Sequence, residues 1–352
     1  EMVGDHNTFV GPGAAYSATD CDRNTVVGRD AAYALTTGDD NVIIGEEAGK
    51  AITTGSSNVF VGANAGDGFD SETNNVGIGN DALGGAINGG EYNVAIGNYS
   101  LDALTTADSN TAVGYEAGSG VTTGGFNVFV GQIAGKATTE GTGNVAVGRN
   151  SLVTNTTGSR NVALGQNAVE YPDTENDNLG IGYNALAGTI AGGEYNVSVG
   201  NLTLDALTSG DYNVAVGYNA GSALNTGSTN TMIGVEAGLQ LTSGGNNTLI
   251  GVEAGRASSP STVTTGSDNI VLGNNSVSDA FIKVDWTVTS DKRDKTDIEP
   301  LTMGLDFVNK LNPVTYRWDM RSDYENKTPD GTHKKQRLFS GLLAQDVETL
   351  ER

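Results

Sequence analysis

The sequence of 352 residues is poor in cysteine, proline and aromatic residues. Its single cysteine, Cys21, excludes a disulfide framework and a cysteine-based zinc site, and leaves the redox compartment open. No apolar run reaches the roughly 18 residues of a membrane span, and the first residues lack the pattern of a signal peptide. Aromatic residues make up 6% of the chain, too few for several large globular cores.

Basic residues are also scarce, and they are unevenly placed. Residues 1–282 contain 7 Lys and Arg against 29 Asp and Glu, whereas residues 283–352 contain 12 against 13. Of the 51 glycines, 48 lie in the first region, without the three-residue period of collagen. An acidic surface of this kind repels phosphate backbones and anionic lipids, which argues against nucleic-acid partners and membrane insertion.

What the sequence does contain is a repeat. An Asn followed four residues later by Gly recurs sixteen times, mostly every 17 residues, with an aliphatic residue directly before each Gly. The Asn positions are 7, 24, 41, 58, 75, 93, 110, 127, 144, 161, 178, 196, 213, 230, 247 and 269. A larger block also recurs, because residues 89–97 return almost unchanged at residues 192–200, a shift of 103 residues. Residues 1–276 are therefore a tandem array.

The period limits the fold. Seventeen residues are too few for a helix pair, and the Asn-Val-x-Val-Gly segment is β-branched and extended. These features predict an all-β solenoid of about 16 coils, each with two short strands and two turns, stacked about 4.8 Å apart. We expect the Gly at a left-handed or closely packed position, and the Asn side chains in a hydrogen-bonded ladder along the array.

The two faces of the repeated strand predict how the chain assembles. The residue before each Gly is never polar, so we expect it to point into the coil. The preceding position, which includes Phe9, Phe60, Phe129 and Met232, would then form an external apolar stripe that needs a partner surface. This pattern predicts a homotrimer that buries the stripe around one axis. The alternative is a monomer whose own turns cover it.

The repeats resemble those of known fibres. Asn-Val-Phe-Val-Gly-x-x-Ala-Gly, followed by Thr-Thr-Gly-x-x-Asn, is similar to the repeat region of phage-type tail fibre proteins, over residues 7–276. More loosely, the array resembles the β-roll heads of trimeric autotransporter adhesins. The resemblance implies a structural or adhesive fibre on a virion or a cell surface, with a host-surface or glycan receptor as its partner.

Residues 277–352 follow a different pattern. A linker, residues 277–289, contains a predicted strand at 281–288, and a helix is predicted at 298–308. Two more strands are predicted at 313–318 and 338–343, on either side of a polar loop, and a second helix begins at residue 344. This order predicts a small α+β domain over residues 290–352.

Three segments in this region carry a second resemblance. They are Ser290-Asp-x-Arg-x-Lys-x-x-Ile298, Leu311-x-Pro-Val-x-Tyr316 and Gly341-Leu-Leu-Ala-Gln-Asp-Val347, and they resemble the C-terminal intramolecular chaperone of endosialidases, the S74 peptidase family. The resemblance implies a domain that drives trimer assembly and then cuts the Ser290–Asp291 bond. It implies Ser290 and Lys295 as the catalytic pair and His333 as an assisting residue. Related domains continue further, so we expect this chain to be a fragment.

The implied chemistry is consistent with the residues themselves. A lysine can accept the proton of a serine hydroxyl when burial or neighbouring cations lower its pKa, and Lys292 and Arg293 flank Lys295. Burial in an assembled trimer would add desolvation, so cleavage would follow folding. The alternative is that residues 290–295 form a solvated charged turn. We expect no cofactor, no metal and no external substrate for the peptidase.

Two other functions stay open. A glycan-degrading tailspike on a β-solenoid needs two carboxylates about 5–10 Å apart in a groove, but the acids here are scattered through turns. An ice- or surface-binding solenoid needs spaced threonines on a strand, whereas the recurrent Thr-Thr pairs mostly precede Gly, as turn residues do.

Overall fold

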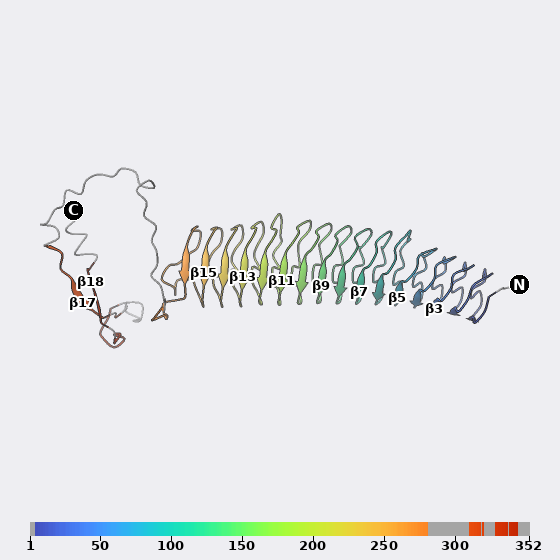
Figure 1. The fold of residues 1–352 in the computed structure, drawn as a ribbon, viewed down its shortest axis with the longest axis horizontal. Helices are drawn as coiled ribbons and strands as arrows, with labels where there is room; N and C mark the ends of the chain where they lie inside the picture. The colour runs from blue at the N-terminus through green and yellow to red at the C-terminus, as the bar shows by residue number, and fades with distance from the viewer. Residues whose placement is uncertain (1–3, 281–309, 318, 320–327, 337, 344–352) are drawn as a thin grey trace. The chain divides into compact units, whose positions relative to one another are not determined.

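The computed structural model describes residues 4–280, 310–317, 319, 328–336 and 338–343. The chain divides into two compact units, Glu1–Ser276 and Val277–Arg352. In the first unit, sixteen three-residue strands form one parallel sheet whose strands follow each other in chain order (Figure 1). Each strand belongs to one coil, so the first unit is the predicted β-solenoid.

The sixteen strands have closely similar sequences and bounds. They are β1 (Thr8–Val10), β2 (Thr25–Val27), β3 (Val42–Ile44), β4 (Val59–Val61), β5 (Val76–Ile78), β6 (Val94–Ile96), β7 (Thr111–Val113), β8 (Val128–Val130), β9 (Val145–Val147), β10 (Val162–Leu164), β11 (Leu179–Ile181), β12 (Val197–Val199), β13 (Val214–Val216), β14 (Thr231–Ile233), β15 (Thr248–Ile250) and β16 (Ile270–Leu272). Neighbours pair one repeat apart, as β9 does with β10. The period of the sequence is therefore the period of the coil.

The expectation of two strands per coil is wrong, because the described coils contain one each. Most coils have left-handed residues at three places: directly before the Asn, and six and eight residues after it. In the coil of Asn93 these are Tyr92 (φ 59°), Tyr99 (φ 59°) and Leu101 (φ 48°). A left-handed residue turns the chain and cannot extend a strand. This part of the coil is joined to the next by single hydrogen bonds, such as Leu101 N–H to Ala117 O at 3.1 Å.

The repeated asparagines form a buried ladder. Oδ1 of Asn144 accepts the backbone N–H of Asn161 at 2.9 Å, and Nδ2 of Asn144 donates to the carbonyl of Gly158 at 2.8 Å. The same two bonds recur in coil after coil, and the asparagines from Asn24 to Asn247 are at most 1% exposed. Each amide therefore satisfies two backbone groups that the turns leave without a partner.

Two separate constraints, one on the backbone conformation and one on the contact with the next coil, favour the glycine four residues after each Asn. Gly148 has a φ of 138°, which L side chains rarely adopt. In addition, a Cβ on Gly148 would lie 2.3 Å from the carbonyl oxygen of Gly165 in the next coil. Any other residue at this position would push the two coils apart.

The face assignment made from the sequence is wrong. The middle residue of the strand points into the coil, because Phe60, Phe129 and Met232 are fully buried within one chain and Phe9 is partly buried. The residue before Gly points outward instead, and Ile44 is 37% exposed. Both faces of the strand are apolar, so alternation identified two faces without telling which one is inside.

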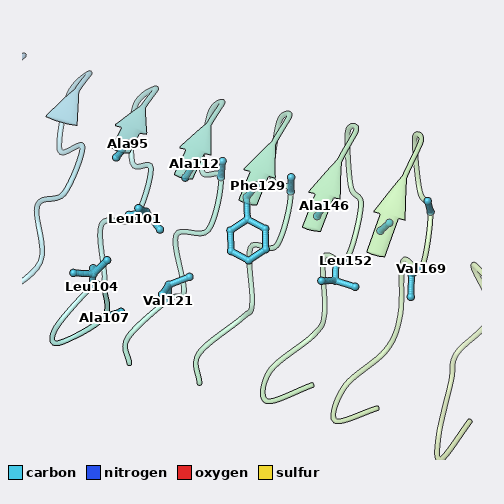
Figure 2. Packing of buried hydrophobic residues seen from close by; sticks show 14 of the residues in the cluster. Ala95, Leu101, Leu104, Ala107, Ala112, Val121, Phe129, Ala146, Leu152 and Val169 are labelled. Carbon is cyan, nitrogen blue, oxygen red and sulfur yellow. The ribbon is translucent and has the colours of Figure 1, made fainter. Parts of the chain in front are cut away.

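In several coils, two of the buried positions exchange volume. They are the middle strand residue and the left-handed residue six positions later. Phe129 is paired with Gly135. Ala95 is instead paired with Leu101, and Figure 2 labels both of these residues. The reason is steric, because a Cβ on Gly135 would lie 2.3 Å from the Phe129 ring. A large side chain at one position is therefore paired with a small residue, such as Gly or Ala, at the other.

Replacing Phe129 by Ala should lower the free energy of unfolding by about 3–5 kcal/mol, because the glycines around the ring offer no side chain to fill the void. Adding Gly135→Leu should recover part of the loss, since it recreates the pair of Ala95 and Leu101. The recovery is incomplete because a leucine in the left-handed conformation costs about 1–2 kcal/mol. Denaturant unfolding of the whole chain, followed by circular dichroism, measures both changes. Equal stability of the single and double variants would contradict the volume exchange.

Replacing Asn144 by Ala should leave the N–H of Asn161 and the carbonyl of Gly158 buried without partners, at about 1–3 kcal/mol for each group. The matched control is Asn98→Ala, because the exposed Oδ1 of Asn98 accepts the N–H of Asn80 at 3.0 Å and water can replace it. We expect the control to change stability by less than about 0.5 kcal/mol. Similar losses in both variants, measured by the same unfolding experiment, would show that the ladder adds nothing.

Candidate functional site

The second unit contains a two-stranded antiparallel sheet. β17 (Val314–Tyr316) pairs with β18 (Phe339–Gly341), and Thr315 lies opposite Ser340. The rings of Tyr316 and Phe339 stack across the pair, with centroids 5.8 Å apart and planes inclined by 20°. The sequence predicts both strands, within residues 313–318 and 338–343, and the structure confirms them.

His333 lies in the segment between these two strands. The preceding turn is held by two carboxylates: Asp319 Oδ2 accepts the N–H of Gly331 at 2.9 Å, and Asp330 Oδ1 accepts the N–H of Thr332 at 3.0 Å. Gly331 has a φ of 91°, in the region that favours glycine. His333 follows directly, and its side chain is exposed on this turn. A histidine in this setting is accessible to a neighbouring segment or chain.

The other predicted site residues, Ser290, Asp291 and Lys295, lie outside the described residues. So do the predicted strand at 281–288 and the predicted helices at 298–308 and after residue 344. Of the predicted site, the structure describes His333 and the two strands on either side of its loop.

A comparison with protein families bears on the same region. Residues 290–350 match the model of the peptidase S74 family, the chaperone of endosialidase. The chain carries an S74 chaperone domain. The matched segment begins at Ser290 and includes all three segments that carry the resemblance. No curated protein and no solved structure matches the chain. The combination of a β-solenoid and an S74 domain fits a tail fibre-like protein.

The outward face of the solenoid sheet is a second candidate functional surface. It consists of the first and third residues of each strand, which are Thr, Val, Ile or Leu in all sixteen strands. Val128 is 36% exposed and Ile250 is 40% exposed, although both lie beside other apolar side chains. With about 3.3 Å per residue and 4.8 Å per strand, this face covers about 700 Å². A continuous apolar face of this size is characteristic of an interface.

The rest of the solenoid surface is acidic, and most of its few basic residues are paired with carboxylates. Arg160 Nε lies 2.6 Å from Asp177 Oδ1, and the hydrogen bonds and charge of this guanidinium lower the pKa of the Asp177 carboxyl. Arg23 and Asp40 form the same contact at 2.6 Å, with the same effect on the pKa of Asp40. Six of the seven basic residues of the array lie in such ion pairs. Along residues 4–280 there is accordingly no cluster of unpaired cations that could bind phosphate groups.

The recurrent Thr-Thr pairs lie in turns, where they join adjacent coils. The hydroxyl of Thr122 donates to the carbonyl of Thr139 at 3.1 Å, and the hydroxyl of Thr139 donates to the carbonyl of Thr156 at 3.1 Å. These hydroxyls are therefore used within the solenoid. Within the described ranges, no helix has the length and hydropathy of a membrane span, and no three His, Cys, Asp or Glu side chains converge as metal ligands.

Proposed function

We propose that the chain is the rod of a homotrimeric fibre or adhesin, assembled with the help of its S74 domain. The observation that supports the trimer is the outward apolar face, which the chain's own turns leave exposed. Its area of about 700 Å² is close to the about 800 Å² that each partner contributes to a stable interface. Three rods around one axis would bury this face along their whole length.

The trimer makes a direct prediction for Val147, an outward residue that is 38% exposed. Val147→Asp should leave the coil folded and dissociate the trimer, because three unpaired carboxylates would be buried at the axis. The control is Thr157→Asp, which adds the same charge to an exposed turn. Sedimentation at micromolar concentration should show a trimer of the 36.0 kDa chain, or of its rod if cut, for the wild type and the control. A wild-type chain that sediments as a monomer would refute the proposed homotrimer.

In this proposal, the S74 domain cuts the Ser290–Asp291 bond after the trimer has folded. A neutral Lys295 takes the proton of Ser290 Oγ, which attacks the scissile carbonyl carbon. The bond to the Asp291 nitrogen breaks as that nitrogen takes up the proton, and water then hydrolyses the ester. Attack by Ser290 on its own carbonyl would close a four-membered ring, so the nucleophile belongs to a neighbouring chain. His333 is the proposed assistant in proton transfer.

The cut predicts two fragments, one ending at Ser290 and one beginning at Asp291. Ser290→Ala removes the nucleophile and Lys295→Ala removes the base, so each should leave one intact band while the trimer still forms. Lys295→Arg should fail as well, because a guanidinium keeps its proton near neutral pH. Denaturing gels and intact mass measure the outcome.

Two results would change this mechanism. A first fragment that ends at Thr289 would indicate attack on the preceding carbonyl through an acyl shift. A Ser290→Ala chain that is still cut at the same bond would show that another protease is responsible. Because assembly is measured separately by sedimentation, the trimer and the self-cleavage can fail independently.

The proposed site of action is the tail of a virion or the outside of a cell. The order of the chain, a long solenoid followed by an S74 domain, favours this proposal. A rigid rod would hold its receptor contacts at a distance from the particle or cell that displays it. The proposed partner is a receptor on a host surface.

A further inference from the structure

A depression with a volume of about 510 Å³ opens on the solenoid among the turns that follow β9, β10 and β11. This volume lies within the range of about 300–1,000 Å³ that is typical of small-molecule sites. Its lining is formed by residues 154, 171, 173–175 and 189–191, from three successive coils. It therefore belongs to a single chain and does not depend on assembly.

The depression lies where the array contains an 18-residue coil, residues 178–195. Glu175, which is 5% exposed, fixes the turn around the extra residue. Its Oε2 accepts the N–H groups of Asp173 and Thr174 at 2.8 and 3.1 Å, and its Oε1 accepts that of Gly192 at 2.8 Å. With three charge-assisted hydrogen bonds, this carboxylate is a structural group. The other side chains are left to face the opening.

An aromatic ring and several hydroxyl groups face the depression. Tyr171 is 41% exposed, and its backbone is fixed because its carbonyl accepts the N–H of Ile190 at 3.2 Å. The hydroxyls of Thr174 and Thr189 form no hydrogen bond with any residue that the structure describes. The hydroxyl of Thr154 donates to the carbonyl of Pro172 at 2.8 Å and can still accept a bond.

The duplicated block provides an internal comparison. In the first copy, Glu72 makes the same three bonds, to the N–H groups of Asp70, Ser71 and Gly89. The ring and two of the hydroxyls are absent there, because Thr154, Tyr171 and Thr189 correspond to Ala51, Gly68 and Ala86. The buried frame is thus common to both copies, and it forms without these three side chains. Folding of the turn therefore does not explain why the second copy carries these three side chains.

We infer that this depression binds one neutral sugar ring of a surface glycan, an inference that rests on the proposed adhesive function. An exposed aromatic face suits the apolar C–H face of a sugar, and threonine hydroxyls can both donate to and accept from sugar hydroxyls. Asp173 uses Oδ1 to accept the hydroxyl of Thr156 at 2.6 Å, which leaves Oδ2 for a sugar hydroxyl. Together with Glu170 and Glu175, this carboxylate repels anionic sugars.

Saturation-transfer NMR on the whole chain tests the inference, with methyl glycosides of neutral hexoses and N-acetylhexosamines against those of sialic and glucuronic acid. We expect binding of a neutral glycoside and none of the anionic ones. Tyr171→Ala should weaken binding about tenfold or more, the equivalent of about 1.4 kcal/mol. Thr189→Ala, which copies Ala86 of the first block, should weaken it less and leave the fold intact.

The control is Tyr183→Ala, which removes a 47% exposed tyrosine from the adjacent 18-residue coil but outside the depression. It should bind as the wild type does. No binding of any neutral glycoside, unchanged binding by Tyr171→Ala, or a preference for anionic sugars would overturn the inference. A chain that binds sugar as an uncut monomer would contradict the fibre proposal alone, and an assembled, cut fibre that binds none would contradict the sugar site alone.

Discussion

The buried asparagine amide holds each coil of the solenoid against the next, and the other contacts of the array depend on the spacing that it sets. Three-residue strands provide few ladder hydrogen bonds, and left-handed turns interrupt the backbone elsewhere in the coil. The amide compensates by joining the start of one coil to the next and by closing its own turn, away from water. At this spacing the stacked glycines are in close contact, and the threonine hydroxyls reach the carbonyls of the following coil.

The sequence predicts the repeat unit well, because the constraints on the backbone fall on single residue types. Asn carries a donor and an acceptor on separate atoms of a short amide, and only Gly tolerates both the φ and the contact at Gly148. The direction of the strand faces could not be predicted in the same way. Both faces are apolar, one because it fills the coil and the other because it lies outside as a candidate interface. The exchange between Phe129 and Gly135 was the signal that identifies the inner face, since such pairs must touch.

The second strand of the coil was a wrong prediction for a related reason. Tyr and Leu are not residue types that favour the left-handed conformation. The left-handed backbone of Tyr99 and Leu101 follows instead from packing within the stack. In the second unit, short segments rich in β-branched and aromatic residues predicted β17 and β18 correctly. The depression beside Tyr171 escaped prediction, although an 18-residue spacing and the contrast with Gly68 in the first copy mark its position in the sequence.

The volume exchange also explains how such a rod can change its length. Because the interior of each coil is filled by its own side chains and by those of the adjacent coils, a block of coils carries most of its interior with it. Contacts reach only the neighbouring coils, so a copied block needs to match only at its two junctions. The 103-residue duplication inserted six coils in this way, adding about 29 Å at 4.8 Å per coil. The reach of the fibre is therefore set by the number of copies in the gene and can be lengthened in small, regular steps while the cross-section stays the same.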